Sequence, residues 1–279
     1  MHTASIILPT ASYRSEMLGH AYRGQPLLAA TASLLLLMMI PTALALGLDA
    51  RTLNGVNVWI KPLKFEASLV VHLLTVAWVL LCLPPERRST RLVRSLAALM
   101  AAAAVFEIAY IALQASRGEA SHFNVATPTA RLLYTLMGIG AVILVATSGW
   151  IGALVLRHGQ TSNPVVFAAG LGLLLGSALG GVAGAYMSTQ SGHWVGGALT
   201  DLGGLPIVGW SRSGGDLRVA HFVGLHLAQA LPIAAWAATR VLPERLRMPL
   251  VVLVAALGTL ATGATFVQAV LGLPLVPAA

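Results

Sequence analysis

The chain has 279 residues, of which 57% are hydrophobic and only 9% are charged, and its formal net charge is +8 at pH 7. Soluble domains carry about 25% charged residues, so this composition excludes an ordinary soluble protein. The positive charge does not indicate nucleic-acid binding, because the basic residues are spread over short segments between apolar stretches. We therefore expect a protein that is surrounded by the lipid bilayer and has no nucleic-acid partner.

Seven apolar stretches have the length of membrane-spanning helices, which need about 20 residues. Their predicted ranges are 26–47, 66–84, 93–115, 130–156, 164–187, 218–239 and 248–272. The predicted fold class is therefore all-α: a polytopic membrane protein built as a bundle of seven transmembrane helices. In this interpretation 1–24 is a polar N-terminal tail and 25–279 is a single transmembrane domain. The long connection at 188–217 is predicted to be an outer loop that closes like a lid.

The basic residues predict the orientation, because arginine and lysine concentrate in cytoplasmic loops. If seven helices alternate, one side holds ten of them: Arg14, Arg23, Arg87, Arg88, Arg91, Arg94, Arg157, Arg240, Arg245 and Arg247. The other side holds seven, which nearby acidic residues almost cancel. The N-terminus is thus predicted to be cytoplasmic and the C-terminus outside. The composition, rich in Ala, Gly and Arg, fits a GC-rich bacterial genome and hence the bacterial inner membrane, which is the plasma membrane.

The third predicted helix carries a polar stripe. Its members lie within about 80° of one another at about 100° per residue, and they are Glu107, Tyr110, Gln114 and Arg117. A carboxylate at mid-helix costs about 2.5–3.5 kcal/mol on insertion scales, so Glu107 should face protein or water. We predict Glu107, Tyr110 and Gln114 as catalytic residues, with Glu107 as a general base or ligand. A buried structural hydrogen-bond network is the alternative.

Polar residues at the outer ends of other helices and in the loops form the predicted substrate-binding set. The sixth predicted helix presents one broad polar face that holds Arg218, His221, His226 and Gln229. The full set is Lys61, Lys64, Arg117, His122, Asn124, His193, Asp216, Arg218 and Gln229. Two plainer interpretations stay open. The lysines would contact lipid headgroups from an amphipathic segment, or the 188–217 connection would be an ordinary interfacial loop.

Ligand-capable side chains on three helices fall at a comparable depth. His226 lies roughly 12 Å below the outer end at 1.5 Å per residue, and His72 and Glu107 lie at a comparable depth. Imidazole and carboxylate suit zinc or iron, so we predict that His72, Glu107 and His226 surround a metal ion with one open position, or a polar catalytic centre. The predicted histidine ligands are His72, His221 and His226. A non-covalent haem b is the alternative cofactor, held by His72 with His226 or by His122 with His221, because no CxxCH motif is present. Histidines that only hydrogen-bond to backbone are the structural alternative.

One motif combination has a parallel in a known family. Ser68 and His72 form a Ser-x3-His pair on the second helix, an acidic residue follows on the third, and a histidine pair comes late. This combination resembles the seven-helix zinc superfamily of alkaline ceramidases and progestin-and-adipoQ receptors. The resemblance implies that His72, His221 and His226 bind zinc and that Glu107 stands where the family has Asp. The chain departs from that pattern, because its late pair is His-x4-His on the sixth helix rather than His-x3-His on the seventh.

The fifth predicted helix has one face without side chains. Glycine recurs there at every fourth position, as Gly172, Gly176, Gly180 and Gly184. A neighbouring backbone can approach closely along such a row. We expect a helix of the same chain to occupy it; a second copy, giving an oligomer through this face, is the alternative.

Three classes of function follow from these features. The favoured class is a metal-dependent enzyme, using zinc, iron or haem, that acts on a lipid- or quinone-like substrate at an outward-facing site within the membrane. A proton-coupled small-molecule transporter would use Glu107 as its protonated carboxylate, but the cytoplasmic halves of the spans are almost wholly apolar. A non-catalytic membrane subunit for binding or assembly would offer its outer loops to a partner.

Overall fold

The computed structural model describes residue 22 and residues 24–278, so the tail predicted at 1–24 falls almost wholly outside the described residues. Regular structure within them is overwhelmingly helical. The helices are α2 (Pro26–Leu48), α3 (Ile60–Val79), the 3-10 helix η1 (Leu80–Cys82), α4 (Pro85–Arg88), α5 (Arg91–Arg117), α6 (Pro128–His158), α7 (Pro164–Ser188), α8 (Leu217–Leu225), α9 (Leu227–Val241) and α10 (Glu244–Val270). Two short antiparallel pairs join β1 (Thr52–Leu53) to β2 (Val56–Asn57) and β3 (Trp194–Val195) to β4 (Gly215–Asp216).

The helices confirm the predicted all-helical fold and are compatible with a multi-pass membrane protein. Six of them are long and apolar enough to cross a membrane, and α8 with α9 adds a seventh if that bent pair is one span. Their first turns carry expected start signals: the side chains of Thr90, Thr127 and Asn163 each accept a hydrogen bond from a backbone N–H. Gly118 ends α5 with a φ of 72°, a left-handed conformation that glycine adopts easily.

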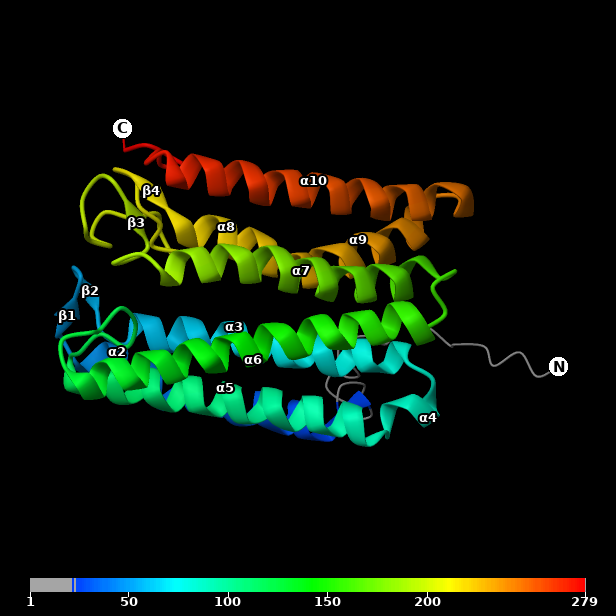
Figure 1. Cartoon of the computed structure of the whole chain (residues 1–279), viewed down its shortest axis with the longest axis horizontal. Coiled ribbons are helices and arrows are strands. Elements are labelled where there is room, and N and C mark those ends of the chain that lie inside the picture. The colour runs from blue at the N-terminus through cyan, green and yellow to red at the C-terminus, as the bar shows by residue number, and fades with distance from the viewer. Residues whose placement is uncertain (1–21, 23, 279) are drawn as a thin grey trace.

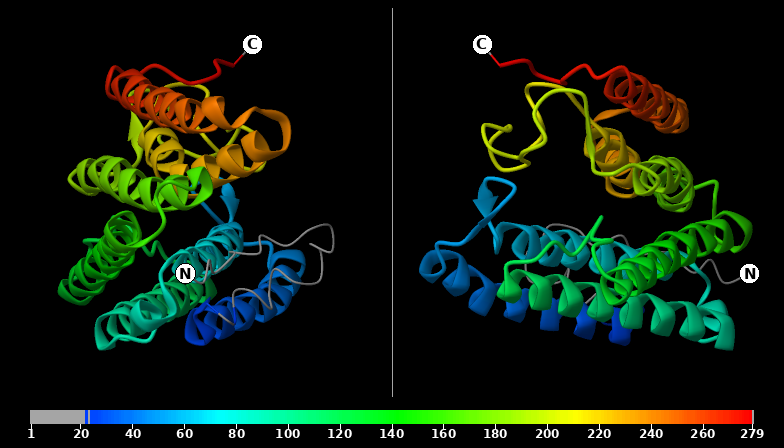
Figure 2. Two further views of the ribbon diagram at one scale, coloured as in Figure 1. Left: turned by 90° about the vertical axis from the view of Figure 1, so that its right-hand side faces the viewer. Right: turned by 60° about the vertical axis from the view of Figure 1, so that its left-hand side comes forward.

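The helices form two groups that lie against each other (Figures 1 and 2). The first group contains α2, α3, α5 and α6, and the second contains α7, α8, α9 and α10. Extensive packing of α6 on α7 joins the groups, whereas α3 has little direct contact with α8 or α9. We call the boundary between α3 and the α8–α9 pair the seam.

Both strand pairs lie at one end of the bundle, and α4 lies at the opposite end (Figure 1). We call the first of these the strand end. It gathers the connections 49–59, 118–127 and 189–216 and the segment 271–278 that follows α10. Most of the hydrogen-bonded polar side chains described below therefore lie at or near one end.

The glycine face of α7 packs within the chain. A Cβ added at Gly172 would lie 2.7 Å from the carbonyl oxygen of Leu227, and one at Gly176 would lie 3.0 Å from that of Leu225. A Cβ added at Gly180 would lie 2.6 Å from Cδ2 of the Leu225 side chain, and Gly224 of α8 fits against the backbone of Gly180. The row thus lets α7 approach the backbone of α8 and the start of α9, as expected from small residues at membrane helix contacts.

The predicted start of the second helix is wrong. The second helix starts at Ile60 rather than 66, since the β1–β2 pair turns the chain early and Pro62 fits a first turn, where its missing N–H costs nothing. Lys61 and Lys64 therefore belong to α3 itself and not to a separate amphipathic segment.

The sixth predicted helix is interrupted at His226. α8 and α9 meet there with a bend of 44°. The carbonyl oxygen of Phe222 accepts the backbone N–H of His226 at 3.0 Å and its imidazole Nδ1 at 2.8 Å. Pro232 then removes a backbone donor within α9. The polar face predicted for one continuous helix is thus divided between two.

Candidate functional site

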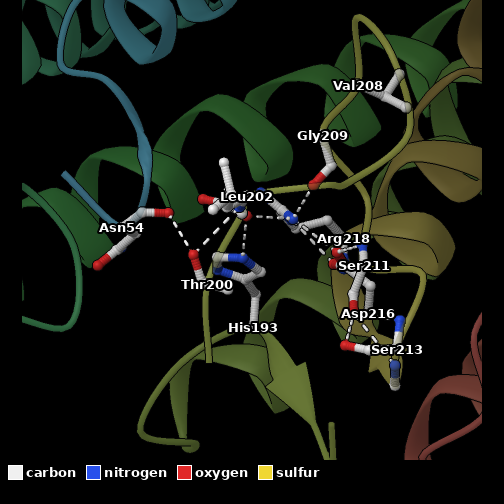
Figure 3. Close-up of polar contacts among 12 residues, drawn as sticks. Asn54, His193, Thr200, Leu202, Val208, Gly209, Ser211, Ser213, Asp216 and Arg218 are labelled. Carbon is white, nitrogen blue, oxygen red and sulfur yellow. Dashed lines mark hydrogen bonds and ion pairs between the residues drawn. The ribbon is translucent and has the colours of Figure 1, made fainter. Parts of the chain in front are cut away.

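Arg218 is the centre of a polar network at the strand end (Figure 3). Its guanidinium group forms a two-pronged ion pair with Asp216, with Nη2 at 2.6 Å from Oδ2 and Nε at 2.9 Å from Oδ1. Nη2 also donates to Asp201 Oδ1 and to the carbonyl oxygen of Gly209, both at 2.8 Å. His193 Nε2 lies 3.1 Å from Asp201 Oδ1. We call Arg218, Asp216, Asp201 and His193 the strand-end network.

Local structure places these groups. Asp216 caps the start of α8, where its Oδ1 accepts the backbone N–H of Arg218 at 3.1 Å. It is 2% exposed, and its Oδ2 also accepts the backbone N–H of Ser211 at 2.9 Å. Pairing of β3 with β4 brings His193 beside α8, since its carbonyl oxygen accepts the backbone N–H of Leu217. The polar atoms of this network are therefore engaged with one another.

The connection 189–216 is tied to the first helix group across the seam. The carbonyl oxygen of Asn54 accepts the backbone N–H of Asp201 and the hydroxyl of Thr200, both at 2.9 Å. Lys64 of α3 donates from Nζ to the carbonyl oxygen of Val208 at 3.0 Å. These three bonds hold the connection over the strand end of the seam; Figure 3 shows the contact of Asn54 with Thr200.

A second group of side chains lies inside the first helix group. It comprises Glu107 and Tyr110 of α5, Phe65 of α3, His122 of the 118–127 connection and Tyr134 of α6, and we call it the acid–aromatic cluster. Glu107 is 3% exposed and Tyr110 is 5% exposed. Neither Glu107 Oε1 nor the Tyr110 hydroxyl has a hydrogen-bond partner among the described residues. Because buried polar atoms are nearly always hydrogen-bonded, these two indicate that a partner is missing.

The surroundings of Glu107 combine open space with a cation. Its Oε1 occupies room left by Gly140 of α6, where an added Cβ would lie 2.5 Å away. The ammonium group of Lys61 is within electrostatic range of the carboxyl group and 5.8 Å from the centroid of the Phe65 ring. No hydrogen bond or ion pair engages Lys61 within the described part of the chain. The Lys61 ammonium group is thus a hydrogen-bond donor that lies beside the cluster and is available to a ligand.

Aromatic rings form the rim of this cluster. The ring of His122 lies 5.7 Å from Phe65 and 6.2 Å from Tyr134, between centroids. Phe123 adds a ring 5.7 Å from Tyr134 and has a φ of 58°, a left-handed conformation unusual for a bulky residue. Tyr110 packs with Phe65 and Met137. The cluster is therefore mostly apolar, with a few hydrogen-bonding groups.

Three predicted site residues organise the 118–127 connection instead. Gln114 donates to Glu119 Oε2 at 3.3 Å and to the carbonyl oxygen of Ala120 at 3.2 Å, and Asn124 donates to that same carbonyl oxygen. Arg117 is exposed and pairs with Glu119 at 3.0 Å. The stripe predicted on the third helix is thus buried at Glu107, Tyr110 and Gln114 but leaves the interior at Arg117.

The predicted metal-ligand histidines each hydrogen-bond to a neighbouring helix or turn. His72 Nε2 lies 2.9 Å from Ser148 Oγ, and His221 Nδ1 lies 2.7 Å from the carbonyl oxygen of Gly180. His226 bonds to Phe222 at the helix break, and Gln229 donates to Thr75 Oγ1 at 3.1 Å across the seam.

His72 and His226 are within electrostatic range of each other, but Glu107 lies beside Gly140 of α6. Among residues 24–278, no three His, Cys, Asp or Glu side chains are grouped so that they could hold a metal ion. The centre of His72, Glu107 and His226 predicted from equal depth stays a prediction without structural support.

Two features escaped the sequence analysis. Glu66 of α3 is 1% exposed and accepts the hydroxyl of Thr42 at 2.8 Å, while its Oε2 has no partner among the described residues. Because the second helix was predicted to start at residue 66, the sequence placed Glu66 at its end and gave no signal that it is buried. The rings of Phe65 and Tyr134 gave none, because single aromatic residues are common in membrane helices.

Acidification should weaken the strand-end network. Burial lowers the pKa of His193 below its usual 6.5, and this outweighs its hydrogen bond to Asp201. Burial would raise the pKa of Asp201, but the hydrogen bond from His193 and the Arg218 charge hold it below its usual value. A pKa that is lower in the folded than in the unfolded protein makes the folded state less stable as the pH falls. The stability linked to His193 is lost below about pH 6.5, and the stability linked to Asp201 is lost below about pH 3.9. We expect the unfolding temperature in detergent to drop in two steps.

The variant His193→Asn separates the two steps. Asparagine does not titrate, so the step below about pH 6.5 should shrink while the acid step remains. An unchanged upper step would show that other groups cause it; Asp216 and Arg218 also face His193, and His122 is within electrostatic range.

No family model, no curated protein and no solved structure matches this chain. The proposed function therefore rests on the geometry of the site.

Proposed function

We propose that the protein spans the bacterial inner membrane seven times, with α8 and α9 as one broken span, a cytoplasmic N-terminus and the strand end outside. The arginines support this orientation. Eight of them lie in or beside the connections at the end opposite the strand end: Arg87, Arg88, Arg91, Arg94, Arg157, Arg240, Arg245 and Arg247.

We further propose that the acid–aromatic cluster binds the head group of an amphipathic molecule from the bilayer, and that the molecule is a quinone. The observation that carries this proposal is the pair of buried, unpartnered atoms, Glu107 Oε1 and the Tyr110 hydroxyl. They are three residues apart on one helix, so they lie on the same face one turn apart. A ligand that reaches one of them is close to the other.

The chemistry of the lining selects the class of ligand. The Tyr110 hydroxyl and the Lys61 ammonium group donate hydrogen bonds, and Glu107 donates one when its carboxyl group is protonated. The ligand should therefore offer acceptors without requiring a strong donor in return. The rings of Phe65 and Tyr134 favour a flat head group. A quinone ring has two carbonyl acceptors, is flat and carries an apolar tail, and it matches all three requirements.

Binding can be measured with decylubiquinone and the purified protein in lipid nanodiscs. We expect saturable binding to the wild type and an affinity weakened about tenfold by Glu107→Leu, because one hydrogen bond from a carboxyl group contributes about 1.5 kcal/mol. Tyr110→Phe should weaken binding about threefold to tenfold. Glu107→Leu should not lower the unfolding temperature, since it removes a buried polar group that has no partner.

Glu66→Leu is the matched control, because it makes the same change at another buried carboxyl group, one that already has a partner in Thr42. Quinone affinity should be unaltered in this variant. The proposal fails if the wild type binds no more than empty nanodiscs do, or if both Leu variants bind like the wild type.

A second candidate, proton-coupled transport, is favoured by the helix break at His226, since discontinuous spans occur at transport sites. Proteoliposomes loaded with a pH-sensitive dye test this candidate. A proton flux that depends on His226 would support transport, and the absence of any proton flux would exclude it.

A further inference from the structure

An apolar groove lies between α2 and α5, near the end of the bundle that holds α4, which we call the α4 end. Leu27 and Thr31, in the first two turns of α2, form one wall, and Ala98, Ala101 and Ala102 of α5 form part of the other. The two helices pack against each other, and both begin at the α4 end (Figure 1). The Thr31 hydroxyl already donates to the carbonyl oxygen of Leu27 at 2.9 Å. We call this feature the α2–α5 groove.

Two arginines lie at the mouth of the groove, on the face of α5 that lines it. Arg94 comes four residues before Ala98 and Arg91 comes seven before it, which are one and two helical turns, so all three share one side of the helix. Both arginines are exposed, and neither guanidinium group has an ion pair or a hydrogen bond within the part of the chain that the structure describes. Arg88 differs, because it donates to the carbonyl oxygens of Leu83 and Leu81.

The local structure of α5 does not explain these two charges. Basic residues in the first turn of a helix face the positive end of its dipole, which is unfavourable. The one acidic residue of α5 is Glu107, and it lies about 160° around the helix from Arg91 at about 100° per residue. Arginines that only set the orientation of a membrane protein can lie on any face of a helix. An anion beside Arg91 and Arg94 would compensate both charges.

We propose that the α2–α5 groove binds one anionic phospholipid, with its phosphate group at Arg91 and Arg94 and one acyl chain in the groove. A guanidinium group is suited to phosphate because it donates two parallel hydrogen bonds. Basic pockets beside membrane helices bind anionic lipid head groups in this way. The charged mouth continues directly into an apolar groove. This continuity favours a lipid over a free phosphate ion, which would contact the arginines alone.

Binding can be measured by adding phosphatidylglycerol to the purified protein in neutral detergent and counting bound lipids by native mass spectrometry. We expect one phosphatidylglycerol to bind more tightly than any phosphatidylcholine, whose head group has no net charge. Arg91→Gln and Arg94→Gln should each weaken this binding about fivefold, the effect of one basic residue near an anionic lipid. Ala102→Leu should weaken it by a similar factor, because leucine would fill the groove without changing any charge.

α10 offers matched controls for both kinds of substitution. Arg245→Gln removes an exposed arginine from the first turn of α10, and Ala256→Leu adds a leucine at an exposed position of the same helix. Both variants should bind phosphatidylglycerol like the wild type. All five changed side chains are exposed, so the unfolding temperature in detergent should stay that of the wild type in every variant.

Four results would overturn the proposal. Equal binding of phosphatidylcholine would show that the charge is not recognised, and an equal loss in Arg245→Gln would show attraction by the whole α4 end. Release of the lipid by millimolar inorganic phosphate would indicate a site for a free anion. An Ala102→Leu variant that keeps its lipid would show that the groove holds no acyl chain; a changed oligomeric state in that variant would then assign the groove to a second copy of the chain. The experiment uses no quinone, so its failure would leave the acid–aromatic cluster untouched.

Discussion

Arg218→Ala should lower the free energy of unfolding by about 3–5 kcal/mol, the cost of removing one member of a buried ion pair. The guanidinium group serves two carboxylates at once, and the side chains of Asp216 and Asp201 are only 1% and 14% exposed. Without Arg218 both negative charges stay at the strand end with backbone and His193 donors alone. Denaturant titration of the purified protein in detergent measures the loss.

The same variant should free the 189–216 connection, which Arg218 also holds through the Gly209 carbonyl oxygen. Trypsin should then cut faster after Arg212 within it. Arg218→Lys keeps the charge but not the planar fork, so its loss should be intermediate.

Arg51→Ala is the control for Arg218→Ala. Arg51 pairs with Asp49 at 2.6 Å, the same distance as Arg218 with Asp216, but its side chain is 51% exposed, so water screens the pair and its loss should change stability little. Equal losses in the two alanine variants would contradict the central role of the strand-end network.

Gly224→Ala should destabilise the contact between α7 and α8. A Cβ at this position would lie 2.7 Å from the backbone nitrogen of Gly180 and 3.0 Å from its Cα, so α7 and α8 must move apart. Forced overpacking of this kind costs about 1–3 kcal/mol, and here the contact is with backbone that has no rotamer to change. The unfolding free energy in detergent should fall by about that amount.

Gly263→Ala is the matched substitution. Gly263 lies inside α10 with nothing within 4 Å of an added Cβ. Alanine favours a helix over glycine by about 0.5–1 kcal/mol, so this variant should be as stable as the wild type or more stable. If Gly224→Ala were equally harmless, the close approach of α7 and α8 would be wrong.

Helix positions could be predicted from the sequence because apolar length and composition determine them directly. The spans at α5, α6 and α7 start and end within a few residues of their predicted ranges. The break at His226 could not, because the apolar pattern continues through it. At the break the His226 imidazole is a second donor to the Phe222 carbonyl oxygen, and hydropathy does not record such a bond.

The candidate site was predictable in its parts but not in its grouping. The polar stripe correctly indicated that Glu107 and Tyr110 are buried, and Asp216 and Arg218 are neighbours in sequence as in space. Depth along a helix says nothing about direction around it, which is why Glu107 lies by Gly140 and not beside His226. Contacts such as Asn54 with Asp201 join segments far apart in the chain, and no local pattern reveals them.

The bonds from the 189–216 connection to Asn54 and Lys64 have a mechanical consequence. The two helix groups share one broad joint, α6 against α7, and at the far side they are fastened mainly where this connection reaches α3 and the β1–β2 pair. We therefore expect that a molecule entering between the two helix groups from the strand end would first have to break these three hydrogen bonds.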